Sequence, residues 1–341
     1  MSELLRDHTT LRLGGPAKEY VVAATEGALI EAVTSAGDIP VLLLGGGSNL
    51  VIADSGFEGR VVEIATRGVS IDDASACAGV SVHVAAGEPW DDLVAHAVGQ
   101  GWVGVEALSG IPGLVGATPI QNVGAYGQEV AETIASVRVF DRVLRGIRTF
   151  ANAECQFGYR HSRFKADPAR HVVLSVEFQF PLGDLGAPVQ YAELARTLGV
   201  EVGRRAPMAD VRDTVLGLRR GKGMVLDAED HDTWSAGSFF TNPMLTAEAA
   251  DGLPADAPRW PQSDGTVKTS AAWLIDHAGF DKGYGNERVS LSTKHPLALT
   301  NRGSAATTDL VALAREVRDG VEAKFGVRLV SEPVFVGCSL D

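Results

Sequence analysis

Ser238 stands in the stretch AGSFFTN, between a glycine and two phenylalanines, and Asn242 follows four residues later. The pattern differs from the nucleophile elbow of a hydrolase, because no glycine stands two residues after the serine. No histidine accompanies the serine as an obvious base. Ser238 is therefore either a buried and satisfied core residue or a residue placed for a different chemistry.

Two glycine-rich stretches could bind a ligand through their main chain. The first is a turn after a strand, at Gly45, Gly46, Gly47, Ser48 and Asn49. Another strand is expected to follow it, whereas the dinucleotide fingerprint opens a helix. Successive glycine N–H groups can form an anion-binding nest, which would hold a diphosphate without a helix dipole. A plain tight turn between strands would have the same sequence.

The second stretch, Leu108 to Glu129, combines five glycines and two prolines with few charges. Glycine lacks the Cβ that would keep the backbone away from a flat ligand. The amides of Gln121 and Asn122 offer donors and acceptors to a heterocycle. An irregular, packed core segment is the alternative interpretation.

Length and composition narrow the class of protein. A chain of 341 residues is long enough for more than one core. A net charge of −13 argues against non-specific binding to nucleic acid or anionic lipid. No run is long and apolar enough to cross a bilayer and the N-terminus lacks a signal peptide, so we expect a cytoplasmic protein. Cys77, Cys155 and Cys338 are far apart, which predicts reduced core thiols and no metal site.

Short strand signals alternate with helical stretches, which predicts an α/β or α+β fold. We expect a helix at 29–36, a helix from about Pro89, and strands at 41–44, 80–87 and 171–180. Apolar residues at three- and four-residue spacing predict a helix over 309–325, capped by Thr307 or Thr308 and ended by Gly326. A final strand is expected over 328–337, with Glu332 before a proline.

Six stretches in order carry a family resemblance: the two glycine-rich stretches, FGYRHSRFK (157–165), AGSFFTNP (236–243), AAWLIDHAGF (271–280) and SEPVFVG (331–337). The chain resembles the UDP-N-acetylenolpyruvoylglucosamine reductase family from about Thr10 to Gly337. The resemblance implies that NADPH reduces bound FAD. The reduced flavin then passes hydride to the methylene carbon of UDP-N-acetylglucosamine-enolpyruvate, giving UDP-N-acetylmuramate in peptidoglycan precursor synthesis.

By motif, the family's catalytic residues correspond to Arg160, Ser238 and Glu332. Hydride addition builds negative charge beside the substrate carboxylate, which an arginine can hold and stabilise. An acid must then protonate the α-carbon, and this is the role the resemblance gives to Ser238.

Resemblance also implies the binding residues. The flavin would meet the turn Gly45, Gly46, Gly47, Ser48 and Asn49, then Pro112, Gly113, Gly116, Ile120, Gln121, Asn122, Gly124 and Arg219. The substrate would meet Tyr126, Tyr191, Lys222, Asn242 and, by a looser match, His295. Tyr191 is found in only one of the two subclasses, on a loop that folds over the substrate.

The implied fold is α+β, the FAD-binding fold of the vanillyl-alcohol-oxidase/PCMH type with a separate C-terminal substrate-binding domain. We expect an N-terminal FAD-binding subdomain at 1–75, a second one at 76–204 and the substrate domain at 205–327. The final segment, 328–341, would return to the first subdomain. No nucleic-acid or membrane partner is expected, and a monomer is predicted.

Other interpretations stay open for several residues. Arg160 with Arg163 and Lys165 would look the same as a solvated surface cluster. Glu332 could be a strand-end carboxylate paired with Arg328. The acidic segment 227–232 departs from the family pattern and lacks metal-ligand spacing, so its side chains are expected in solvent. A flavin-dependent alcohol oxidase of the same fold group and a non-catalytic flavin-binding module are the rival functions.

Overall fold

The computed structural model describes residues 3–75 and 79–341, which pack into two compact units. The terminal unit comprises Met1–Lys18, Gly47–Glu58 and Gly221–Asp341, and the central unit comprises Glu19–Gly46 and Gly59–Arg220. The boundaries of the three predicted domains stay a proposal. No helix in the described ranges has the length and apolar character needed to cross a membrane.

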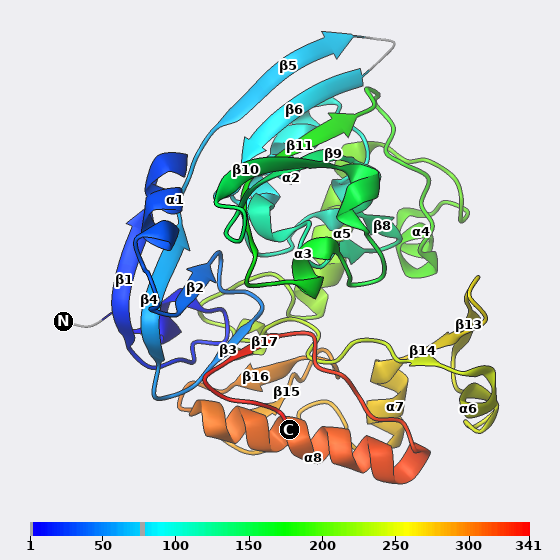
Figure 1. The fold of residues 1–341 in the computed structure, drawn as a ribbon. Coiled ribbons are helices and arrows are strands. Elements are labelled where there is room, and N and C mark those ends of the chain that lie inside the picture. Colours follow the sequence, from blue (N-terminus) through cyan, green and yellow to red (C-terminus); the bar gives the residue numbers. More distant parts are fainter. Residues whose placement is uncertain (1–2, 76–78) are drawn as a thin grey trace. The chain divides into compact units, whose positions relative to one another are not determined.

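The central unit is built on two sheets (Figure 1). The three-stranded sheet has the order β1-β4-β2, and the five-stranded antiparallel sheet has the order β10-β9-β11-β6-β5. Their bounds are β1 Ala17–Ala23, β2 Val41–Leu44, β4 Phe57–Ile64, β5 Val69–Ser75, β6 Gly79–Ala85, β9 Ile134–Asp141, β10 Gly146–Ala151 and β11 His171–Phe180. A short hairpin joins β7 Gly124–Ala125 to β8 Gln128–Glu129.

The strand β11 confirms the clearest strand prediction. It pairs with β6 on one side and β9 on the other. Val176, Phe178 and Phe180 are fully buried, whereas the residues between them are not. This alternation is the period-two pattern expected of a strand with one face in the core. The predicted strands at 41–44 and 80–87 are confirmed as β2 and β6.

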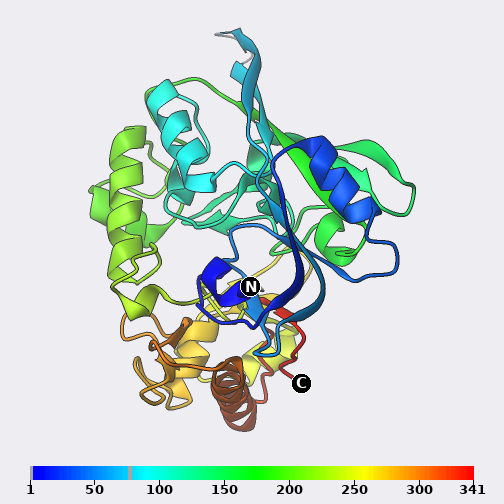
Figure 2. The same ribbon diagram turned by 90° about the vertical axis from the view of Figure 1, so that its left-hand side faces the viewer.

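Five helices belong mainly to the central unit: α1 Glu26–Thr34, α2 Trp90–Gln100, α3 Arg163–Ala166, α4 Ala192–Leu198 and α5 Met208–Gly221. The apolar face of α1 packs with β4 and β11 through Leu29, Val62 and Leu174. Figure 2 shows α5 alongside α2. The Arg212 guanidinium on α5 donates to both carboxylate oxygens of Asp91 on α2, at 2.7 and 2.9 Å.

The terminal unit is assembled from three separate pieces of the chain. Its strands are β3 Leu50–Ile52, β12 Met244–Leu245, β13 Arg259–Pro261, β14 Val267–Thr269, β15 Val289–Leu291, β16 Leu299–Asn301 and β17 Val334–Val336. Its helices are α6 Ala247–Asp251, α7 Ala271–His277 and α8 Thr307–Phe325, the last running along β15 and β16 (Figure 1). Leu11, Leu13 and Val51 share one core with Phe239 and the apolar face of α8.

Short 3₁₀ helices occur within the connections: η1 Leu5–His8, η2 Glu106–Leu108, η3 Val115–Ala117, η4 Val130–Glu132, η5 Asn152–Cys155 and η6 His231–Thr233. Cys155 is a buried free thiol and Cys338 a half-buried one. Burial raises the pKa of Cys155 to about 12, so this residue stays a thiol at neutral pH. Cys77 lies outside the described residues.

The helix predicted over 309–325 is confirmed, but its predicted cap is wrong. The N-cap residue is Ala306, and Gly326 ends the helix in the left-handed conformation, as expected. The Asp54 carboxylate accepts from the main-chain N–H groups of Thr307 and Thr308. Thr307 instead turns its hydroxyl to the carbonyl of Ile52. A distant carboxylate thus replaces the local threonine cap. Its negative charge also interacts favourably with the positive end of the helix dipole.

The predicted final strand over 328–337 is also too long. Only Val334–Val336 forms β17, which pairs in parallel with β3. The residues before Pro333 pair elsewhere, through a bridge between Ser331 and Phe240. Proline cannot donate a ladder hydrogen bond, so the segment changes partner at this position.

Candidate active site

Ser238 lies on an irregular segment that is held on both sides. Gly237 adopts a left-handed conformation (φ +71°), and its N–H donates to the Ser235 hydroxyl at 3.2 Å. The Phe239 N–H donates to the Leu297 carbonyl at 2.7 Å. Phe239 and Phe240 are buried in the core of the terminal unit. Ser238 itself is half-buried, and its hydroxyl makes no hydrogen bond to another residue within the described ranges.

The segment with Glu332 lies directly beside the segment with Ser238. The Glu332 N–H donates to the Phe239 carbonyl at 2.8 Å, and the Thr241 N–H donates to the Val330 carbonyl at 3.0 Å. These bonds flank the bridge between Phe240 and Ser331. The structure therefore places the two segments that carry Ser238 and Glu332 side by side, although they are far apart in the chain. Arg328, the alternative partner considered for Glu332, pairs with Glu322 and Asp341.

Asn49, the last residue of the first glycine turn, joins this group within the terminal unit. Its carbonyl accepts from the Val334 N–H at 2.9 Å, and its side-chain amide donates to the Glu332 carbonyl at 3.4 Å. Gly47 has φ +60°, and a Cβ there would lie 1.9 Å from the carbonyl oxygen of His8. No side chain fits at this point of the turn. Strands β2 and β3 flank the turn, as predicted.

Asn242 fixes the start of helix α7. Its side-chain oxygen accepts from the Ala271 N–H at 3.0 Å, and Ser270 caps the same helix through its hydroxyl. The predicted substrate residue therefore has a defined place at a helix N-terminus. Lys222 directly follows α5, at the start of the chain's return into the terminal unit.

Arg160 belongs to the central unit and is anchored in the second glycine-rich stretch. Its guanidinium donates to the carbonyls of Gly124 (2.9 Å) and Asn122 (3.4 Å). Its backbone is left-handed (φ +51°), and its own carbonyl accepts from the Lys165 ammonium at 3.0 Å. A half-buried, anchored side chain contradicts the alternative of a solvated basic cluster. A non-glycine residue at this φ also carries strain, which is common at functional sites.

The two glycine-rich stretches meet inside the central unit. A Cβ on Gly46 would lie 2.8 Å from the Cα of Gly113, and a Cβ on Gly116 would lie 2.5 Å from the Cβ of Ala86. Gly113 has φ +120°, and its carbonyl accepts from the Trp90 N–H. Main chain rather than side chains therefore lines this part of the fold. Glycine is needed at positions 46 and 116 because the chain segments approach each other closely here.

Asn122 is buried and its side chain supports the loop. Its amide donates to Glu129 (2.6 Å) and to the Gly158 carbonyl (3.2 Å), and its oxygen accepts from the Ala131 N–H (3.2 Å). The backbone there is left-handed, with φ +44°. Nearby, Ile120 is partly exposed, and its carbonyl accepts from the hydroxyl of buried Ser162. Pro112, Gln121 and Gly124 are half-buried in the same stretch.

Arg219 and two tyrosines lie on neighbouring parts of the central unit. Burial lowers the pKa of the Arg219 guanidinium, while Tyr126 and Asp91 counter this electrostatically. The Tyr126 and Tyr191 rings meet edge to face, with centroids 5.4 Å apart. Tyr191 precedes α4 and is 44% exposed. A guanidinium close enough to Tyr126 to interact with it electrostatically is a group that can bind a phosphate.

Sequence reasoning missed two carboxylates that hold these loops. Asp91 accepts from the Gly110 N–H at 2.6 Å in addition to its pair with Arg212. Glu106 is fully buried and accepts from Gly104 N–H (2.7 Å) and Ala187 N–H (2.6 Å). Gln128 also donates to Glu106 at 2.9 Å. Neither residue belongs to a recognisable motif, because its partners are main-chain groups from distant segments.

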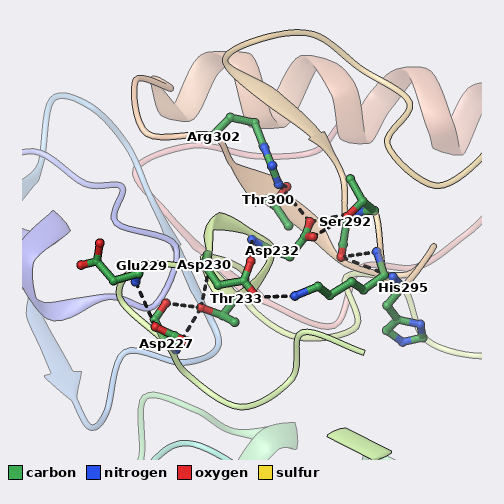
Figure 3. Close-up of polar contacts among 11 residues, drawn as sticks. Asp227, Glu229, Asp230, Asp232, Thr233, Ser292, His295, Thr300 and Arg302 are labelled. Carbon is green, nitrogen blue, oxygen red and sulfur yellow. Dashed lines mark hydrogen bonds and ion pairs between the residues drawn. The ribbon is translucent and has the colours of Figure 1, made fainter. Parts of the chain in front are cut away.

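The acidic segment 227–232 differs from its prediction (Figure 3). Asp227 and Glu229 are exposed, as expected. Asp232 is buried, and Asp230 pairs with Lys294. The prediction of a fully solvated segment is therefore wrong, because cationic and hydroxyl donors at 292–302 attract two of its carboxylates. His295 is half-buried on the turn that these carboxylates contact.

Comparison with known proteins shows two family matches in this chain. Residues 17–143 match the sequence model of an FAD binding domain, and residues 229–336 match that of the UDP-N-acetylenolpyruvoylglucosamine reductase C-terminal domain. Reductases of that name from Streptomyces avermitilis and Cutibacterium acnes are 59% and 57% identical to this chain. The matches cover 97% of this chain in both cases, and 93% and 89% of the two relatives.

A solved structure agrees over the whole chain. The crystal structure of UDP-N-acetylenolpyruvylglucosamine reductase from Thermus caldophilus aligns with a TM-score of 0.67 and 25% identity, over 98% of both chains. The fold and the glycine-lined surface thus define an FAD-binding protein with a second, separate domain. More narrowly, the chain belongs to the UDP-N-acetylenolpyruvoylglucosamine reductase family.

Proposed function

We propose that this chain reduces UDP-N-acetylglucosamine-enolpyruvate to UDP-N-acetylmuramate, with NADPH as the electron donor. This is the activity of its family, in peptidoglycan precursor synthesis. Bound FAD would supply the hydride relay between NADPH and the methylene carbon of the enolpyruvyl group. The observation that carries the residue assignment is the main-chain pairing of the Ser238 and Glu332 segments.

Ser238 donates the proton that the substrate's α-carbon requires. Its hydroxyl is half-buried and not committed to another described residue. A serine hydroxyl is a weak acid, but the enolate-like intermediate formed on the substrate is strongly basic. Glu332, whose N–H is tied to the residue after Ser238, polarises and orients this side of the site. The buried phenylalanines keep the serine segment in place.

Arg160 binds the substrate carboxylate and stabilises the negative charge that hydride transfer creates. A guanidinium matches a carboxylate with two parallel hydrogen bonds. The hydrogen bonds from Arg160 to the Gly124 and Asn122 carbonyls fix the orientation of the guanidinium before the substrate binds. Such preorganisation lowers the cost of ordering the site during the reaction.

The cofactor contacts follow the glycine-lined surface. The FAD diphosphate would lie on the turn Gly45, Gly46, Gly47, Ser48 and Asn49, and the ring system along Pro112, Gly113, Gly116, Ile120, Gln121, Asn122 and Gly124. Asn122 would contribute through its main chain, because its side-chain amide is already used within the loop. Arg219 supplies a partly desolvated positive charge for a phosphate.

The substrate contacts are Tyr126, Tyr191, Lys222, Asn242 and His295. The exposure of Tyr191 and its edge-to-face contact with Tyr126 support a covering role, typical of the subclass with the substrate-covering tyrosine. We propose that the enzyme works as a monomer.

The decisive experiment separates the two half-reactions of Ser238→Ala by stopped-flow absorbance of the flavin. Flavin reduction by NADPH should stay within about twofold, whereas reoxidation by the substrate should slow by at least about a hundredfold, the usual scale of a lost general acid. Ser55→Ala, an exposed serine of the same unit, is the control and should leave both rates unchanged. Equal loss of both half-reactions would contradict the assignment of Ser238 as the proton donor.

The same assay tests the rival functions. Rapid reoxidation of the flavin by oxygen with an alcohol as donor would indicate an oxidase. Bound flavin that NADPH and the substrate never turn over would indicate a non-catalytic module.

A further inference from the structure

Asp232 is a buried carboxylate that binds two separate points of the segment 292–302. It accepts from the Thr293 N–H at 2.9 Å and from the Thr293 hydroxyl. It also accepts from the Arg302 guanidinium at 2.9 Å, and Figure 3 shows both residues, Asp232 and Arg302, facing each other. Only 4% of Asp232 is exposed, so these donors replace its water shell.

Asp230 reinforces the same contact. Its carboxylate accepts from the Lys294 ammonium and from the Asp232 N–H, the latter at 3.0 Å. On the facing turn, the Ser292 hydroxyl accepts from the N–H groups of Lys294 (3.0 Å) and His295 (3.3 Å). The turn 292–295 is thus fixed internally by Ser292 and externally by the two carboxylates.

The segment that leads from Asp232 to Ser238 runs along the chain that follows this turn. The Asn301 N–H donates to the Trp234 carbonyl at 3.0 Å, and Ser235 and Thr300 form an isolated antiparallel β-bridge. At the far end, Phe239 N–H bonds the Leu297 carbonyl. Main-chain pairing therefore joins residues 234–239 to residues 297–301. Asp232 adds a side-chain connection just before this pairing begins.

The charge of Asp232 is maintained at neutral pH. Burial by itself raises the pKa of this carboxyl group, but the hydrogen bonds from Thr293 and the nearby Arg302 charge outweigh burial and hold the pKa below its ordinary value. A neutral amide could not satisfy the same donors, because it brings its own two N–H groups into a site already lined by donors.

We infer that Asp232 is a positioning residue, which sets the spacing between Ser238 and the turn that carries His295. The inference rests on the proposed function, in which Ser238 gives the proton and His295 meets the substrate. A buried carboxylate with a guanidinium and hydroxyl partner makes a rigid connection, whereas main-chain pairing alone would let the turn shift. Misplacement of about 1 Å at a reacting group can cost about a hundredfold in rate.

The test measures both half-reactions of Asp232→Asn and Thr293→Val in stopped-flow experiments, in H₂O and in D₂O. Flavin reduction at saturating NADPH should stay within about twofold, while substrate-dependent reoxidation should slow by about ten- to a hundredfold. The solvent deuterium isotope effect on reoxidation should rise in both variants, because the proton from a displaced Ser238 would limit the rate. The double variant should be no worse than the more affected single variant.

Two controls make the outcome clear. Thr293→Val removes the hydroxyl donor but keeps the Thr293 N–H bond and the Arg302 bond to Asp232, so this variant should keep the fold even if Asp232→Asn does not. Glu229→Gln removes one charge from an exposed position in the same segment and should leave both rates and the isotope effect unchanged. A lower melting temperature with an unchanged isotope effect in both variants would overturn the inference, because it would reduce Asp232 to a stabilising residue. No substrate-dependent reoxidation in the unaltered enzyme would overturn the proposed function as well.

Discussion

At the scale of single residues, Asp141 shows how one buried carboxylate can order the end of a strand and the turn after it. One oxygen accepts from the N–H groups of Val143 and Leu144 in the turn after β9, both at 3.0 Å. The other accepts from the Arg170 guanidinium through two nitrogens, at 3.0 and 2.9 Å. The Arg170 hydrogen bonds are the largest cause of a lowered pKa, about 2 instead of 3.8 for Asp141.

This pKa predicts a pH dependence of stability with a definite sign. The folded state binds the proton of Asp141 less tightly than the unfolded state does, so the carboxylate stabilises the fold fully above about pH 4. That contribution should be lost as the pH falls toward about 2. Urea unfolding of Asp141→Asn should therefore give a lower midpoint than the unaltered protein at pH 7, and the difference should shrink below about pH 4.

Asp38→Asn, at an exposed position, is the control for this comparison and should leave the midpoint unchanged at every pH. A difference between Asp141→Asn and the unaltered protein that stays constant from pH 7 to pH 2 would contradict the ion pair as its source.

At the scale of elements, helix α8 depends on a carboxylate from outside the helix. Asp54 follows β3 and accepts from the first N–H groups of α8, at 2.7 Å from Thr307 and 3.3 Å from Thr308. Asp309 adds a reciprocal contact by accepting from the Ala306 N–H at 2.8 Å. The start of the longest helix in the terminal unit is thereby tied to the strand that pairs with β17.

Asp54→Ala should lower the free energy of unfolding by about 1 to 2 kcal/mol, the cost of a lost helix cap together with its dipole interaction. Urea denaturation followed by circular dichroism measures this change. Thr308→Ala keeps the N–H that Asp54 binds and should have a smaller effect. A change in Asp54→Ala within error of zero would show that solvent replaces the carboxylate without cost.

At the scale of the whole molecule, the terminal unit cannot be cut out as one piece of sequence. Leu11, Leu13 and Val51 lie in its core with 0–3% exposure, and β3 supplies the partner of β17. A fragment of residues 221–341 lacks all of these groups. It would expose the apolar surface of several large side chains, and a small domain has little stability to spare.

The fragment 221–341 should therefore lack the near-ultraviolet circular dichroism of a packed core and should bind the dye ANS. The full chain should show that circular dichroism and should not bind ANS.

Leu13→Ala in the full chain removes only one of the side chains that the fragment lacks. It should cost about 2 to 5 kcal/mol in urea unfolding, as expected for a buried leucine. A fragment with cooperative unfolding would contradict the shared core.

Much of the fold and of the candidate site could be predicted from local patterns. The strand β11, the helix α8 with its glycine C-cap and the strand–turn–strand at Gly45–Asn49 all follow from periodicity and glycine placement. Local patterns did not predict the cap of α8, the short β17 or the inward-facing Asp230 and Asp232. Each depends on a partner far away in the chain, and local residue preferences carry no information about such a partner.

The family, its chemistry and the candidate residues Ser238, Arg160 and Glu332 could be predicted from the sequence alone. Motifs in a fixed order can be identified without a structure. Tertiary structure alone decided that the Glu332 segment pairs with the Ser238 segment, that Arg160 is anchored on the glycine-rich loop, and that Asp232 holds the turn of His295. The physical reason is that hydrogen bonds between distant segments form only once hydrophobic burial has brought those segments together.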